Sequence, residues 1–582
     1  MHHLLFSFAL SLFVLASACS NPRVQSTVVD DTPPASDADQ DTTASAPDTS
    51  GEDPTDGTAE DTITMLGNLP SAPATPPHAG VFTGSVECNF CHSQGDGVLT
   101  GPGGADISPT HLFGRSMMAH SARDPYWLAQ LSHERVATPA ADAAILDVCT
   151  RCHAPVANEL ARQAGTTPTF EALTSGTTPI DHLGREGVTC TVCHQITDEG
   201  LGTEASFVGG YVIGTERQIF GPHADPFANP MRMRLDYEPT QAEHVMQSEL
   251  CATCHTVITE ALDPSGTPTG ARFAEQVPYL EWRNSTAAAE GTSCQACHSP
   301  RVSPEGEAYA SVLSLRPPSL TTVRPVGVHS FTGGNANMLE ALAANLEWSG
   351  VATSAAELRE AAADADEFLA AAIRLTTASV EGTRVTFRVT NEAGHKFPTA
   401  YPTRRAWLEV VGYDASGAET FHSGATKSEG FITNPDGSAE GDEPRPHYDV
   451  IDDEADVQVW QGIMADDAGL PTHTLLRGAQ WWKDDRLLPL GWSASHPDAT
   501  MTAPVGVGDD PNFVPGSDDV TYILPEGTVR VEATLLYQTV PPTSARALDR
   551  DPTPASRRFV DVLANGPPVP RRVSAVEVSL AP

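Results

Sequence analysis

The pattern of hydrophobic and polar positions divides the chain into unequal stretches. An apolar run extends from Leu4 to Leu15, and residues 20–80 then show few large side chains and no hydrophobic period. Residues 81–348 are rich in Gly, Pro and Thr and show little regular periodicity. We therefore expect short helices and irregular chain in residues 81–348, and regular elements after them.

A helix is predicted to connect two domains at residues 349–374. Ser354 and Glu357 form a capping-box pattern, S-x-x-E, at the start of an Ala-rich stretch. The large apolar residues of this stretch are Leu358, Phe368, Leu369 and Ile373. Their spacing favours a helix over a strand.

Strands are predicted from residue 375 onwards, because the hydrophobic period changes to two. Val385, Phe387 and Val389 alternate with polar residues in RVTFRVTN. Further strands are expected in AWLEVVGYDASG, TVRVEATLLYQTV and VSAVEVSL. The predicted fold class is α+β: a mainly α and irregular domain over 81–348, followed by an antiparallel β-sandwich over 375–582.

The N-terminal residues predict export. Residues 1–19 end in LFVLASAC, which is typical of a lipoprotein signal whose lipidated residue would be Cys19. An ordinary secretory signal cleaved near Ala18 is the alternative, since the opening MHH carries no Lys or Arg. With residues 20–80 as a disordered acidic tether, we expect an exported lipoprotein that faces the periplasm or the outer surface. No later stretch is apolar enough to span a membrane.

The charge balance excludes one class of partner. Lys and Arg number 34 against 75 Asp and Glu, which gives a formal net charge of −41. Nucleic-acid binding needs clustered basic residues for phosphate contacts, so no nucleic acid is expected. Such a surface suits cationic partners or simple solubility.

Ten of the eleven cysteines lie in five CxxCH motifs. The motifs are Cys88, Cys91 and His92; Cys149, Cys152 and His153; Cys190, Cys193 and His194; Cys251, Cys254 and His255; and Cys294, Cys297 and His298. This spacing is typical of c-type haem attachment: two thiols form thioethers and the adjacent His ligates the iron. Zinc knuckles or disulfides are the alternative, but the gaps between motifs are long for compact zinc sites. We expect five covalently attached haem c groups in residues 81–348.

Each haem iron needs a second axial ligand unless its position is open. Nine histidines outside the motifs lie within residues 78–395: His78, His111, His120, His133, His182, His223, His244, His329 and His395. The six predicted iron ligands among them are His120, His182, His223, His244, His329 and His395. His182 and His244 lie shortly upstream of a motif, whereas His329 and His395 have nearby Gly residues that allow a close approach to a flat cofactor. Met117 and Met118, beside His120, are further possible ligands.

An ordered set of stretches carries a family resemblance from about residue 85 to 545. It includes SMMAHSARDPYWLA, GREGVTCTVCH, SELCATCH, HSFTGGN, NEAGHKFPTAYPTRRAWLEV and WWKDDRLLPLGW. Together these stretches resemble exported multihaem cytochromes c related to the tetrahaem electron carriers of nitrifying bacteria and to octahaem hydroxylamine-oxidoreductase-like proteins. The resemblance implies that the β domain packs on the haem domain and that His395 reaches back to a haem. Departures at Ser299, Ala400, Asp485 and Leu488 touch no proximal ligand.

Electron transfer is the favoured function. Spare histidines favour iron closed on both sides, and redox proteins, such as other cytochromes, are the expected partners. The alternative is an oxidoreductase that acts on a small nitrogen or sulfur compound at one open iron, for which His133, Tyr126, Arg115 and Arg123 are candidate lining residues. No CxxCK motif is present and no catalytic residue is singled out. A role as a subunit of a surface complex, with the β domain as binding module, would complement electron transfer.

Overall fold

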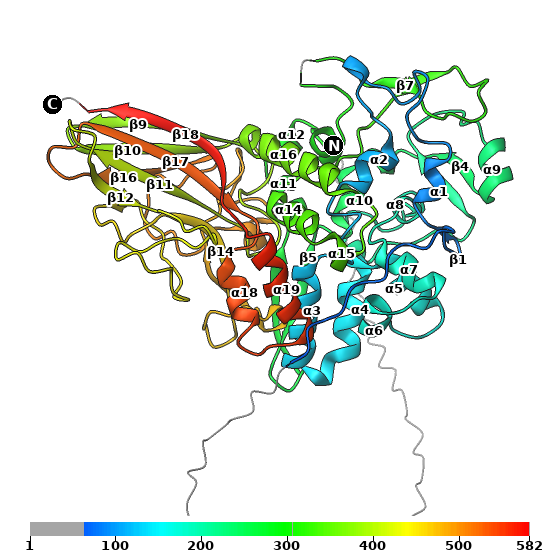
Figure 1. The fold of residues 1–582 in the computed structure, drawn as a ribbon, viewed down its shortest axis with the longest axis horizontal. Helices are drawn as coiled ribbons and strands as arrows, with labels where there is room; N and C mark the ends of the chain where they lie inside the picture. The colour runs from blue at the N-terminus through cyan, green and yellow to red at the C-terminus, as the bar shows by residue number, and fades with distance from the viewer. Residues whose placement is uncertain (1–62, 305, 581–582) are drawn as a thin grey trace, which may run out of the picture. The chain divides into compact units, whose positions relative to one another are not determined.

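The computed structural model describes residues 63–304 and 306–580. Thr62–Pro582 form one compact unit, in which long strands gather at one end and short helices at the other (Figure 1). The predicted signal peptide, Cys19 and residues 20–62 of the predicted tether lie outside the described residues. None of the described helices is long and apolar enough to cross a bilayer.

The folded body begins before residue 80, the predicted end of the tether. Leu69 is only 3% exposed and packs in a cluster with Trp127 and Trp348. The backbone N–H of Leu69 donates to the Trp348 carbonyl at 2.8 Å, and that of Leu66 donates to Pro554. Two leucines in an otherwise polar segment are therefore enough to bind it to the body, because each buries apolar area.

The first half consists of short helices joined by long loops. These helices are α1 (Val86–Asn89), α2 (Pro109–Gly114), α3 (Pro125–Ala137), α4 (Asp142–His153), α5 (Pro155–Gln163), α6 (Phe170–Thr174), α7 (Pro179–Arg185), α8 (Cys190–Cys193), α9 (Asn229–Leu235), α10 (Ser248–Ala252), α11 (Pro278–Arg283), α12 (Thr286–Ala289), α13 (Cys294–His298), α14 (Ala336–Ala344) and α15 (Leu346–Ser349). The CxxCH motifs lie on or directly after α1, α4, α8, α10 and α13. A helical turn places Cys i, Cys i+3 and His i+4 on one face, which suits attachment to a single flat group.

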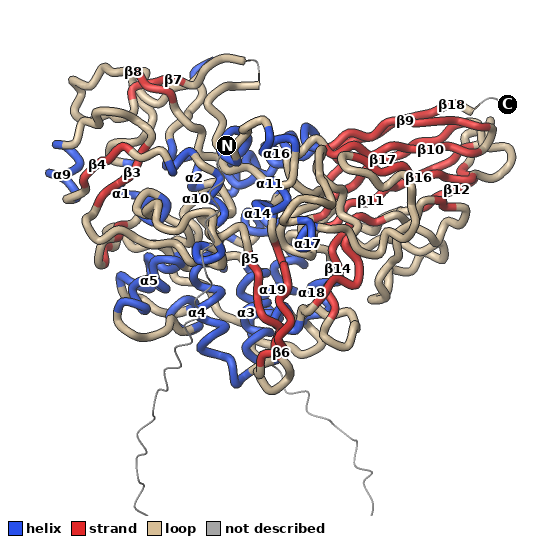
Figure 2. The backbone as a smooth tube through the Cα atoms, turned by 180° about the vertical axis from the view of Figure 1, so that it is seen from behind, coloured by secondary structure: helices blue, strands red, loops and turns tan. Residues whose placement is uncertain are grey.

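Four two-stranded ribbons supplement these helices. They are β1 (His78–Ala79) with β2 (Phe82–Thr83), β3 (Gln218–Gly221) with β4 (Glu238–Gln241), β5 (Val257–Leu262) with β6 (Pro268–Gln276), and β7 (Ala310–Val312) with β8 (Val323–Pro325). Only the β3–β4 ribbon is parallel among them. Loops dominate this end of the molecule (Figure 2).

The predicted connecting helix is α16 (Ala355–Ala372). The Ser354 side chain accepts the Glu357 backbone N–H, and the Glu357 side chain accepts the Ser354 N–H, so the predicted capping box is present. Leu358, Ala362, Ala365 and Leu369 form its buried stripe. The helix runs directly into the first long strand, since Ile373 at its C-cap is already extended.

Two facing sheets form the second half. One has the order β13 (Val450–Ile451), β16 (Ser517–Ile523), β10 (Arg384–Asn391) and β9 (Ile373–Glu381). The other has the order β15 (Gln480–Asp484), β14 (Val459–Ala465), β11 (Arg405–Tyr413), β17 (Arg530–Gln538) and β18 (Arg571–Ser579), with β12 (Glu419–Ser423) also paired to β11. Both contribute to one core that contains Val385, Phe387, Val389, Leu408 and Leu535. All pairs are antiparallel except the short β13–β16 pair. This mixture of helices and sheets agrees with an α+β fold.

Helices interrupt the predicted all-strand region. These helices are α17 (Ala499–Thr502), α18 (Pro542–Leu548) and α19 (Pro554–Asn565). Phe559, Val562 and Leu563 in α19 have helical spacing, and Thr553 caps the helix. Because α19 packs against α3, with the Phe559 and Tyr126 rings 5.4 Å apart, the C-terminal residues help to build the first half.

Candidate cofactor site

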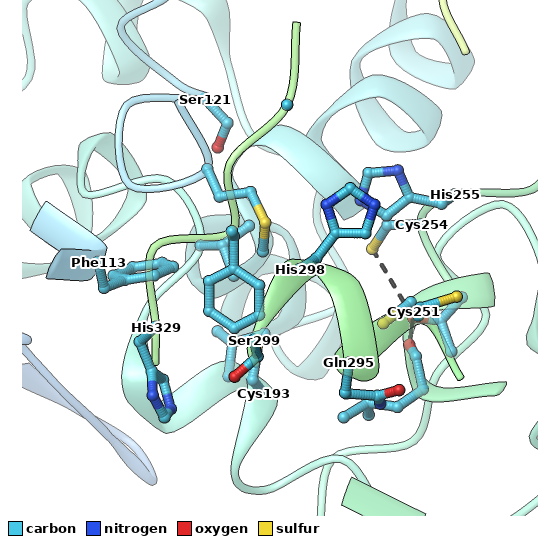
Figure 3. A pocket seen from close by; sticks show the side chains of 18 of the residues that line it. Phe113, Ser121, Cys193, Cys251, Cys254, His255, Gln295, His298, Ser299 and His329 are labelled. Carbon is cyan, nitrogen blue, oxygen red and sulfur yellow. Dashed lines mark hydrogen bonds between the residues drawn. The ribbon is translucent and has the colours of Figure 1, made fainter. Parts of the chain in front are cut away.

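A cavity of about 1720 Å³ lies at the helical end of the molecule. Pockets for one drug-sized ligand measure about 300–1,000 Å³, so this cavity has room for more than one group. All ten motif cysteines and all five motif histidines line it. Figure 3 shows part of it, with Cys193, Cys251, Cys254, His255, His298 and His329 around the same space.

The ten described cysteines are free thiols, several of which touch a thiol of another motif. Three pairs lie close enough for one thiol to shift the pKa of the other: Cys88 with Cys190, Cys152 with Cys254 and Cys251 with Cys294. In residues 63–304 and 306–580, the motif side chains form no group of three or more that could hold a metal ion. This arrangement forms no zinc knuckle among the described residues and fits thiols that each bond to a larger group.

The histidines of four motifs use one ring nitrogen in the same way. Their Nδ1 atoms bond to backbone carbonyls: His92 to Leu313 at 2.8 Å, His153 to Ser121 at 3.2 Å, His194 to Phe220 at 2.6 Å and His298 to Thr332 at 2.8 Å. An N–H at Nδ1 leaves the Nε2 lone pair free, which is the tautomer that binds metals through Nε2. Burial lowers the pKa of His153, His255 and His298 to about 4, so these rings are neutral at pH 7.

Two of the predicted distal histidines face motif histidines. The His329 and His194 ring centroids are 6.2 Å apart, and those of His395 and His298 are 6.4 Å apart, with interplanar angles of 18° and 15°. Two imidazoles on opposite sides of one metal have centroids roughly 6.3 Å apart, because each metal–nitrogen bond is about 2 Å long. The Nδ1 atoms of both distal rings also bond to backbone carbonyls, at Gly327 and Lys396. Both pairs therefore have the spacing that an axially ligated iron needs.

The structure places the other four predicted ligands differently. His120 is buried, its ring bonds to the Gly114 backbone, and its Nε2 has no hydrogen-bond partner. His223 lines the cavity, whereas His120, His182 and His244 are not among the lining residues. His244 Nε2 bonds to the Ile196 carbonyl at 2.9 Å, and His182 Nδ1 faces Arg185 at 3.2 Å. His120 thus offers a free buried nitrogen, while His182 and His244 do not face any motif histidine here.

A buried polar cluster lies beside the second motif and lines the cavity. Burial raises the pKa of Glu134 to about 7 and that of Glu275 to about 8. Burial also raises the pKa of the Cys149 thiol, and the two carboxyls add to that shift. Near them the Tyr126 and Tyr401 hydroxyls are 3.4 Å apart. Of these four, the sequence suggested only Tyr126, since single glutamates carry no signal of burial.

Of the other residues suggested for an open site, none lines the cavity. His133 Nε2 bonds to Thr474, Arg115 pairs with acidic residues of α16, and Arg123 donates to backbone carbonyls, including that of Ser349. None of the three is among the lining residues. They stabilise packing between segments instead.

A buried ionic network holds the segment that carries His395. Lys396 Nζ lies 2.6 Å from Asp484 Oδ2, and Arg486 binds both oxygens of the same carboxylate. Glu281, on α11, accepts the Lys396 backbone N–H at 3.2 Å. The network therefore connects the loop of His395 to β15 and to the helical half. The stretches NEAGHKFPTAYPTRRAWLEV and WWKDDRLLPLGW both carry the family resemblance, but the sequence does not reveal that their charged residues pair.

Comparisons with known proteins add little to this geometry. No protein-family model matches the chain, and no curated protein matches it. Among solved structures, the chain is similar to a penta-heme cytochrome c552 from Thermochromatium tepidum, with 17% sequence identity and a TM-score of 0.42 over 74% of this chain and 83% of that chain. A likeness this distant does not by itself show a shared fold or activity.

Proposed function

We propose that this protein is a five-haem c-type cytochrome that transfers electrons. The observation that carries the proposal is the pair of opposed imidazoles, His194 with His329 and His298 with His395, each beside a CxxC pair in one cavity. Iron with two imidazole ligands has no position open to substrate and changes only its oxidation state. Haem supplies the electron chemistry, and the chain supplies attachment, axial ligands and an apolar enclosure.

Contacts between motif cysteines support a connected path. Cys88 touches Cys190 of the third motif. Cys254 of the fourth motif lies close enough to Cys193 of the third to add to the rise that burial causes in the pKa of Cys193. The fourth motif also touches the second, through Cys152, and the fifth, through Cys294. In space, the first motif therefore adjoins the third, and the third adjoins the fourth. The second and fifth motifs each adjoin the fourth as well. Groups bonded to touching thiols lie close together, as stepwise electron transfer requires.

The proposed cell compartment and redox partner are supported by the sequence alone. The apolar run and Cys19 support export and lipid anchoring to a membrane, and the acidic residues after them support a tether. The net charge of −41 favours a cationic redox partner, such as another cytochrome.

A second candidate function rests on the second motif. The His153 and Trp127 rings stack with centroids 4.7 Å apart, and, like His92 and His255, His153 faces no opposed histidine among the described residues. Glu134, Glu275 and Tyr126 line the cavity nearby and could donate or accept protons. This arrangement supports an oxidoreductase acting on a small nitrogen or sulfur compound at one open iron.

Spectroscopy of the purified protein distinguishes the two functions. Haem content and mass come first, and fewer than five covalent haems would contradict the five-haem proposal. Electron paramagnetic resonance of the oxidised protein and carbon monoxide binding to the reduced protein then report the iron ligands. The carrier function predicts low-spin iron throughout and no gas binding. One high-spin haem that binds the gas would instead favour the second function.

A further inference from the structure

Three side chains converge in the β-sheet half, away from the motif cavity. His447 Nε2 lies 2.9 Å from Asp510 Oδ2 and 4.0 Å from Asp518 Oδ2, with the three side chains 3%, 2% and 0% exposed. One ligand atom of each lies within 4.8 Å of the other two. They come from the loop before β13, the loop before β16 and β16 itself, so the cluster joins three separate segments.

Asp518 points independently to a ligand. Its Oδ2 accepts the Trp460 indole N–H at 2.8 Å, but its Oδ1 is buried with no hydrogen-bond partner. A buried carboxylate oxygen without a partner costs free energy, which is why such atoms are rare in native proteins. A cation bound between Asp518 and its two neighbours would remove that cost.

The Nδ1 atom of His447 bonds to a carboxylate, as the second ring nitrogen of metal-binding histidines commonly does. Its Nδ1 lies 3.1 Å from Asp485 Oδ2, and Gln458 Nε2 lies within 3.1 Å of both atoms. An N–H donated to a carboxylate orients the ring and leaves Nε2 to bind a metal. Nε2 faces the Asp510 and Asp518 carboxylates, and a metal would take the place of the proton that it shares with Asp510.

We propose that His447, Asp510 and Asp518 bind a divalent transition-metal ion, with Zn²⁺ as the best match. A histidine nitrogen disfavours Ca²⁺ and Mg²⁺, which take oxygen ligands, whereas Zn²⁺ combines histidine nitrogen with carboxylate oxygen. The ion is structural, because its ligands are buried. It fastens β16, the loop before β16 and the loop before β13 at the sheet edge where β13 pairs through only two residues.

Elemental analysis of the intact, haem-loaded protein tests this proposal. Purification from zinc-supplemented medium should yield about one zinc per chain in addition to the haem iron. Zinc-edge X-ray absorption should show nitrogen and oxygen neighbours only. D518N and H447A should each lose the zinc, whereas H422A should retain it. His422 is the matched control, since it also contacts two carboxylates, Glu409 and Glu419, but is 32% exposed.

A second measurement covers variants that fail to fold. Dialysis of the unmodified protein against a strong chelator should lower its unfolding temperature, and added Zn²⁺ should restore it. The proposal is overturned by an absence of stoichiometric metal together with no binding of added Zn²⁺ at micromolar concentration. Sulfur neighbours at the zinc edge would also overturn it, since they place the ion at motif cysteines. An absence of metal does not bear on haem content, so this proposal can fail while the electron-transfer proposal stands.

Discussion

Single histidines decide which irons can bind an added ligand such as carbon monoxide. In the proposed haem protein, H329A or H395A should convert one low-spin iron to a high-spin iron that binds carbon monoxide, because each removes the imidazole opposite a motif histidine. Electron paramagnetic resonance and gas titration measure the change. The matched control is H244A, since His244 Nε2 bonds to a backbone carbonyl instead. An open iron in H244A alone would contradict the ligand assignment.

Buried carboxyls near the second motif should make one reduction potential depend on pH. Burial raises the pKa of Glu275 from 4.5 to about 8, so this group is mainly neutral at pH 7 and charged above pH 8. A negative charge that appears as pH rises stabilises ferric iron and lowers the midpoint potential. For a unit charge roughly 10 Å away at an effective dielectric constant of about 20, the effect is on the order of tens of millivolts.

Spectroelectrochemical titration from pH 6 to pH 9 measures this dependence. One haem should show a falling potential in the unmodified protein, and E275Q should flatten the curve because the amide does not ionise. Glu134, with a pKa raised by burial to about 7, contributes the lower part of the same range. An unchanged curve in E275Q would show that the charge arises elsewhere.

At the scale of elements, buried charges connect the helical and strand halves. Lys396 and Asp484 are 0% and 1% exposed, and their pair fixes the loop of His395 against β15. K396M leaves the buried Asp484 carboxylate without its Lys396 partner, so we expect it to reduce the free energy of unfolding by about 3–5 kcal/mol. Chemical denaturation followed by tryptophan fluorescence measures the loss.

An exposed ion pair provides the comparison for K396M. Arg374 and Glu392 are 2.5 Å apart in the same half, but their side chains are 61% and 45% exposed. R374A should cost less than about 1 kcal/mol, because water screens and replaces such a pair. Equal losses in the two variants would mean that the buried network does not connect the halves.

For the whole molecule, the two halves have different kinds of core. Side chains of both sheets fill the strand half, whereas the helical half surrounds a cavity of about 1720 Å³. We expect chains made without haem attachment to lose compactness mainly in residues 81–348, since nothing else fills that volume. Limited proteolysis followed by mass spectrometry should recover fragments from residues 375–580. Equal protection of both halves would show that the cavity does not depend on haem.

The sequence by itself determined the features that depend on local spacing. The five CxxCH motifs, the capping box of Ser354 and the alternation of Val385, Phe387 and Val389 each follow from side chains within a few residues of one another. Local spacing also suggested His329 and His395, because flanking glycines let the backbone approach a flat group. It suggested His182 and His244 equally well, and these face no motif histidine in the structure.

Only the tertiary structure decided which distant residues meet. The pairing of His395 with His298, the network of Lys396 with Asp484, and the cluster of His447 with Asp510 and Asp518 each join residues far apart in the chain. Helix α19 was missed although its apolar residues have helical spacing and Thr553 caps it, and packing against α3 holds both α18 and α19 in place. Burial, and therefore pKa and ligand geometry, arises when separate segments exclude water together, and no local pattern encodes it.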